Sequence, residues 1–231
     1  MPYSRSSART SAARRLAELR RPFAYAKVRT RLLPTPIRDS IFQNSVFQMS
    51  AVLEDYFGEL TTSWFSNLLA AGALASTVPS TTRAFVIGRT YEDAFRRYFG
   101  LGDEQDLASR ILAEPNIINV LDDGAPLPSL EYRSKIIKDK KFPSAYNVET
   151  LFKRLGLKKV LQLTSARTHT NVELGLRAFM DVRNSLAHEN PPSITDLDVE
   201  RYFRQIDLWI GAFDREFYRH VVRVSGSAHW A

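Results

Sequence analysis

The chain has 231 residues, 44% of them hydrophobic, which is enough to bury the core of one domain with an extension or of two small domains. It contains no cysteine, which excludes disulfide frameworks and thiolate metal sites and suits a reducing cytoplasm. The most apolar segment, "WFSNLLAAGALAS", is too short for a membrane span, so we expect a cytoplasmic protein without membrane-spanning helices.

The net charge of +7 is concentrated at the start of the chain. Residues 1–38 carry ten Lys or Arg and one acid, whereas the remaining 193 residues carry 22 basic and 24 acidic groups. Such a segment is typical of a solvated arm, of an arm that binds nucleic acid by counterion release, or of an organellar transit peptide. We therefore divide the chain into a basic N-terminal arm (1–38), a helical domain (39–224) and a C-terminal tail (225–231).

The pattern becomes helical after the breaker "LLPTP". Apolar residues recur at steps of three and four, as one face of a helix requires: Phe42, Val46, Met49, Leu53, Phe57 and Leu60. They predict a first long helix. Further helices are expected at about 62–76, 81–99 and 104–113, with glycines ending the third and a proline following the fourth.

Residues 115–147 contain four prolines and the basic run "KIIKDKK", which predicts mainly loop, as a surface loop or as a binding or lid region. "AYNVETLFKRLGL" then predicts a short helix ending at Gly156. Two helices close the chain, one over 169–187 and one that begins at the capping-box pair Thr195 and Asp198. Strand signals are weak, and "RAFVIG" is the one short strand candidate. We therefore predict an all-α fold, a helical bundle.

One residue of the 169–187 helix does not match its apolar face. On a helical wheel Arg183 falls within the apolar stripe that begins at Val172 and Leu176. A buried guanidinium without a partner is costly, so Arg183 must meet an acid, water or an anionic ligand where the stripe leaves the core. It is either a paired structural arginine whose stem covers apolar surface or an arginine that binds an anion.

His188 follows five residues after Arg183, just before the breakers "NPP" end the helix. A long arginine side chain can reach along the axis toward it, although a histidine here also complements the carbonyl end of the helix dipole. The other histidines, His169, His220 and His229, match no motif and are expected at the surface or at helix ends. Their spacing matches no zinc signature.

The sequence "RNSLAH", residues 183–188, matches the R-x(4–6)-H signature of the HEPN superfamily, and Asn184 is the polar residue that usually follows the arginine. Residues 40–220 resemble the RiboL-PSP-HEPN branch through three segments in the same order: "SVFQMSAVLEDYF", "PSAYNVETLFKRLGL" and "DVRNSLAHENPPSITDLDVERYFRQIDLWI". The basic segment and the chain end lie outside the resemblance.

The resemblance implies a HEPN-like bundle and a metal-independent endoribonuclease whose dimer brings two motifs together around one phosphodiester. It implies His188 as general acid or base, Arg183 as phosphate clamp and Asn184 as the residue that orients the site. Glu54 in the first helix is implied as a further polar contributor, or else as a surface ion-pairing residue. Histidine titrates near neutrality and arginine offers a two-pronged fork to phosphate, so these residue types suit the reaction.

No cofactor and no metal ion are expected. The resemblance implies RNA as substrate, and a toxin or phage-defence effector as the setting, with an antitoxin or defence-system protein as a possible partner. A two-fold homodimer is expected around the helix of Arg183, with Phe179 and Leu186 sealing the contact. The alternatives are a non-catalytic HEPN module that binds nucleotide or RNA or mediates dimerisation, and a helical scaffold whose motif is coincidental; the intact motif favours the ribonuclease.

Overall fold

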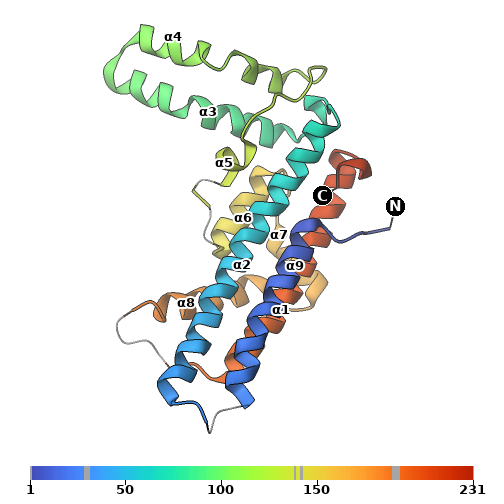
Figure 1. Cartoon of the computed structure of the whole chain (residues 1–231). Coiled ribbons are helices and arrows are strands. Elements are labelled where there is room, and N and C mark those ends of the chain that lie inside the picture. Colours follow the sequence, from blue (N-terminus) through green and yellow to red (C-terminus); the bar gives the residue numbers. More distant parts are fainter. Residues whose placement is uncertain (1, 29–31, 138, 141–142, 189–192, 231) are drawn as a thin grey trace.

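The computed structural model describes residues 2–28, 32–137, 139–140, 143–188 and 193–230, and throughout this part the protein is all-α, as predicted (Figure 1). Its β pairing amounts to one isolated bridge between Leu74 and Pro126 in the described ranges. No helix in the same ranges is long and apolar enough to cross a membrane.

Three long helices run side by side through the body of the molecule (Figure 1): α1 (Ser7–Val28), α2 (Thr35–Ala70) and α9 (Asp196–Val224). Aromatic rings join them at the centre. Phe57 of α2 meets Phe213 of α9 edge-on with ring centroids 5.3 Å apart, and Phe152 stacks on Phe213 at 5.7 Å. These are the ring geometries that aromatic quadrupoles favour, and they hold the central helices in one core.

The structure corrects the prediction of separate helices at 42–60 and 62–76, because α2 continues without a break to Ala70. The polar residues Thr61 and Thr62 do not interrupt it. Their hydroxyls donate to the carbonyls one turn earlier, at 3.0 Å and 2.9 Å, which leaves the backbone helical. The helix ends instead before Gly72, which adopts a left-handed φ of 60°.

The basic segment is a helix of the bundle and not an arm outside it. Helix α1 buries a stripe of small and apolar residues in the common core: Ala8, Ala12, Leu16, Phe23 and Ala26. Two of its cations pair with acids of neighbouring helices, Arg15 with Asp55 and Lys27 with Glu200. The expected division of the chain at residue 38 therefore differs from the structure, because α1 belongs to the same bundle as the helices of the domain. Its small and apolar residues, spaced between the arginines, form the packing face.

A buried carboxylate on α9 holds the first residues of the chain. Asp214 has no exposed surface and accepts hydrogen bonds from the hydroxyls of Tyr3 and Ser6. At the other terminus, the Trp230 indole nitrogen donates to the Ser4 carbonyl at 3.0 Å. Both ends of the chain are thus attached to the bundle, including most of the expected tail 225–231, and they lie close together in Figure 1.

Helices α3 (Ser80–Leu101) and α4 (Glu104–Leu112) form a hairpin that projects from the body in Figure 1, and they confirm the predictions for 81–99 and 104–113. The strand candidate "RAFVIG" lies inside α3. Gly102 ends α3 with a left-handed φ of 70°, and its amide donates to the Tyr98 carbonyl at 2.7 Å. Helix α4 buries none of its residues, so the end of the hairpin is open to solvent.

The region 115–147, expected as mainly loop, contains the short helices η2 (Pro115–Leu121) and α5 (Tyr132–Ile137). Tyr132 anchors α5 to α2, because its ring stacks on Phe65 with centroids 4.2 Å apart. Ile136 is fully buried beside it. The helix-breaking residues of this region therefore predicted a loop, whereas contacts with other helices hold a short helix in place there.

Helix α6 (Ala145–Arg154) forms as predicted, with the Ser144 hydroxyl capping its first turn. The helix expected over 169–187 forms as α8 (Val172–Ser185), and it follows a helix that the sequence did not predict, α7 (Val160–Thr168). His169 separates them in a left-handed conformation with a φ of 53°. Helix α9 begins with the predicted capping box, in which Thr195 and Asp198 satisfy each other's amides.

Candidate functional site

Helix α8 carries the motif residues and is fixed to the core along one side. Val172, Leu176, Phe179 and Met180 are buried, and the Asn171 side chain caps the first turn by accepting from the Leu174 amide at 2.9 Å. The last regular turn is then followed by two tighter backbone hydrogen bonds, from the amides of residues 187 and 188 to carbonyls three residues earlier. The motif therefore lies at the end of a well-anchored helix.

Arg183 is half-buried, as expected for a cation at the edge of an apolar stripe. Its guanidinium carbon lies 5.5 Å from the centroid of the Phe47 ring on α2, within the range of a cation–π contact. Its Nη1 donates to the Asn184 Oδ1 at 3.3 Å. The structure thus brings Arg183 and Asn184 together and places an aromatic ring against the arginine.

His188 lies beyond the end of α8 and its side chain is exposed. Its backbone amide donates to the Ser185 carbonyl at 3.3 Å, which continues the helix by one tight turn. Five residues at helical rise separate it from Arg183 by about 7.5 Å along the axis. The following "NPP" segment lies outside the described residues.

Glu54 is not at this end of α8. It follows Phe47 by seven residues on α2, which returns it to nearly the same face about 10 Å further along the axis. There it lines a cavity of about 990 Å³ between α2, α3 and α5. The structure therefore separates Glu54 from the Arg183 and Asn184 pair.

The cavity at Glu54 has walls of mixed charge, to which α2 contributes acids, α3 both acids and bases, and α5 bases, with one further acid just before α5: Glu54, Asp55, Glu92, Asp93, Glu131, Arg89, Arg96, Arg133 and Lys135. Gly58 forms part of its floor, because a Cβ at this position would lie 2.6 Å from the Arg133 Nη2. A glycine inside a long helix thus leaves room for a guanidinium against the backbone. This cavity was not expected from the sequence, in which its residues are up to 83 positions apart.

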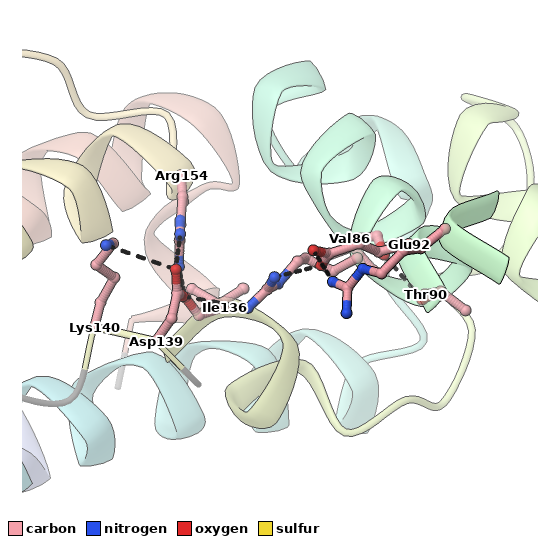
Figure 2. Close-up of polar contacts among 9 residues, drawn as sticks. Val86, Thr90, Glu92, Ile136, Asp139, Lys140 and Arg154 are labelled. Carbon is pink, nitrogen blue, oxygen red and sulfur yellow. Dashed lines mark hydrogen bonds and ion pairs between the residues drawn. The ribbon is translucent and has the colours of Figure 1, made fainter. Parts of the chain in front are cut away.

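An ion-pair network fixes one wall of the cavity (Figure 2). Asp139 accepts from Arg154 Nη1 and Nη2 at 2.7 Å and 3.0 Å and pairs with Arg89 at 3.4 Å. Arg89 also pairs with Glu92, and these contacts tie α3 to α6. The hydrogen bonds from Arg154 hold the pKa of the Asp139 carboxyl far below its usual value. The sequence contained no local sign of the network.

Two of the three remaining histidines lie at the end of a helix, and the third lies in the core. His169 ends α7, as predicted, and His229 is half-buried in the short helix η3 (Ser227–His229). His220 was expected at the surface or a helix end, and the structure corrects this, because it is only 2% exposed inside the core. Its Nε2 lies 2.8 Å from the Leu155 carbonyl. Among the described residues, no group of three or more His, Asp or Glu side chains is arranged to hold a metal ion.

Comparison with known proteins adds no assignment: no family model, no curated protein and no solved structure matches the chain.

Proposed function

We propose that this protein is a metal-independent endoribonuclease of the HEPN type, with Arg183, Asn184 and His188 at its active site. The observation that carries the proposal is the arrangement at the end of α8. A half-buried arginine is held between an aromatic ring and an amide, and an exposed histidine follows one and a half turns later. This arrangement supports the motif resemblance because both side chains are accessible from the same end of one helix.

RNA supplies its own nucleophile in this reaction. A base removes the proton of the 2′-OH, the O2′–P bond forms, the P–O5′ bond breaks, and an acid protonates the departing O5′. The products are a 2′,3′-cyclic phosphate and a 5′-OH end. Histidine suits either proton transfer, whereas Arg183 suits the charge that develops on the phosphate oxygens.

A second copy of the chain completes the proposed site. One chain offers one His188, which holds one protonation state at a time, whereas cleavage needs both a base and an acid. A two-fold axis near the end of α8 supplies the second imidazole. The prediction that Phe179 and Leu186 form the dimer contact is wrong, because both are buried within the chain, at 0% and 5% exposure. The proposed contact therefore uses the outer side of α8, where Leu174 is 63% exposed.

The proposed setting is a cytoplasmic toxin or phage-defence effector that cleaves RNA, held in check by an antitoxin or a defence-system partner. This setting follows from the resemblance of residues 183–188 and their surroundings to the HEPN superfamily.

The test is incubation of the purified protein with total RNA in excess EDTA. We expect cleavage with 2′,3′-cyclic phosphate ends, no cleavage of a DNA analogue that lacks the 2′-OH, and a loss of about 10²-fold or more in His188→Ala and Arg183→Ala. Matched controls are His169→Asn, which removes another exposed histidine, and Arg97→Ala, which removes an exposed arginine of α3 away from the end of α8. Strict dependence on added metal, or full activity in His188→Ala, would contradict the mechanism.

A non-catalytic HEPN module that binds RNA is the second candidate. The observation that favours it is the separation of Glu54 from Arg183, which leaves the motif without the further acid that the resemblance implied. In that case the protein would bind RNA with an affinity that depends on Arg183 and would leave the RNA intact in the same assay.

A further inference from the structure

Phe47 is a residue of α2 that no motif singled out, although it contacts the central residue of the proposed site. It is half-buried and packs against the core with part of its ring. The guanidinium of Arg183 lies over that ring, with the guanidinium carbon 5.5 Å from its centroid. The contact joins residues that are 136 positions apart in the sequence.

An aromatic ring in this position restrains the arginine without the negative charge that a carboxylate would bring. The attraction comes from the negative face of the ring, so it leaves the positive charge of the guanidinium in place. The N–H groups lie around the edge of the planar fork, and one of them, Nη1, already donates to Asn184. Neither the ring nor the amide carries a charge, so these two contacts restrain the fork without opposing its positive charge.

We propose that Phe47 is a positioning residue for Arg183, holding the guanidinium in the orientation in which its edge meets the phosphate oxygens at the transition state. The inference deepens the proposed function and rests on it. A flexible arginine would have to be ordered during each reaction cycle, whereas a stacked one is ordered beforehand. The effect of Phe47 therefore belongs to kcat more than to KM.

The experiment measures the steady-state kinetics of RNA cleavage by Phe47→Leu and Phe47→Tyr. Leucine retains apolar bulk and removes the aromatic face, whereas tyrosine retains the face. We expect Phe47→Leu to lower kcat about 10-fold with KM changed less than about 2-fold, which is the range of a cation–π contact, and Phe47→Tyr to restore most of the rate. Phe47→Met serves as a second aliphatic replacement if the leucine variant does not fold, as judged by circular dichroism.

Phe85 provides a matched control within the same chain. It is also half-buried, and the guanidinium of Arg154 lies over its ring at 4.2 Å, but it belongs to the network between α3 and α6. Phe85→Leu removes a contact of the same kind away from the end of α8. We expect it to leave kcat unchanged within about 2-fold, since neither Phe85 nor Arg154 takes part in the proposed reaction.

A double-mutant cycle separates positioning from a general effect on folding. If Phe47 acts through Arg183, then Phe47→Leu has no further effect on the residual rate of Arg183→Ala. An equal loss in both backgrounds, or a wild-type rate in Phe47→Leu, overturns the inference while leaving the ribonuclease intact. Absence of RNA cleavage by the wild-type protein is a different result, because it overturns the proposed function and this inference with it.

Discussion

At the scale of single residues, the environment decides what a side chain of a given type does. His188 is exposed at the end of α8, whereas His220 is a buried residue of α9 that faces the C-terminal end of α6. A carbonyl oxygen can only accept, so the His220 Nε2 donates to Leu155 and its Nδ1 accepts from Arg223 at 3.3 Å. Burial, with a smaller contribution from the Arg223 charge, lowers the pKa of His220.

The lowered pKa of His220 predicts a stability loss in mild acid. In the unfolded chain a histidine takes up its proton as the pH falls through about 6.5. The folded protein takes up that proton only at lower pH, so the unfolded state binds more protons below about pH 6.5 and the free energy of unfolding decreases there. Denaturant titrations at several pH values should show this decrease. Replacing His220 with Gln should reduce this decrease below about pH 6.5.

His169→Asn is the control for this titration, because it removes an exposed histidine at a left-handed position that asparagine tolerates. A pH dependence that is the same in His220→Gln and in the unchanged protein would show that His220 does not cause the loss.

At the scale of elements, α1 combines a packing face with a charged outer face. Its cations fall into two groups. Arg15 and Lys27 pair with acids, and Arg20 lies over the Phe203 ring at 5.3 Å, so these side chains attach α1 to the bundle. Arg14 and Arg21 are exposed on the opposite side and are available to phosphates. The helix thus has a structural role and a surface suited to nucleic acid.

The exposed arginines of α1 predict a contribution to RNA affinity. Deleting the segment would remove a core helix, so the test is the double variant Arg14→Gln with Arg21→Gln. If each arginine neutralises one phosphate of single-stranded RNA, the slope of log affinity against log salt becomes shallower by about 1.4. Arg96→Gln with Arg97→Gln on α3 changes the net charge equally and should have a smaller effect. If the α1 variant leaves the slope unchanged, Arg14 and Arg21 do not neutralise RNA phosphates and interact with solvent alone.

At the scale of the whole molecule, the proposed reaction depends on two copies of the chain. The end of α8 lies on the same side of α2 as the α3–α4 hairpin in Figure 1, and His188 is exposed there. In the proposed dimer each chain would contribute one Arg183 and one His188, so that the composite site takes both residue types from both chains.

Subunit mixing tests the composite site. His188→Ala retains Arg183, and Arg183→Ala retains His188, so a heterodimer of the two contains one of each. We expect the mixture to cleave RNA faster than either variant alone, with mass measurements showing dimers. A mixture no more active than its components, or a strictly monomeric wild-type protein with full activity, would contradict the dimeric site.

The sequence by itself determined the features that depend on local spacing. Helical periodicity predicted the α-helical class and the positions of α3, α4 and α6, and capping chemistry placed the start of α9 at Thr195. The same periodicity showed that Arg183 interrupts an apolar stripe, and the structure places it half-buried there.

Only the tertiary structure decided which faces meet, because periodicity shows that a face is apolar and not what covers it. It placed α1 in the core, although the arginines in its composition suggested a solvated arm. It joined Arg183 to Phe47 and separated it from Glu54, since seven residues of one helix are enough to separate two side chains by two turns. These pairings depend on packing between residues far apart in the sequence, and no short segment contains that information.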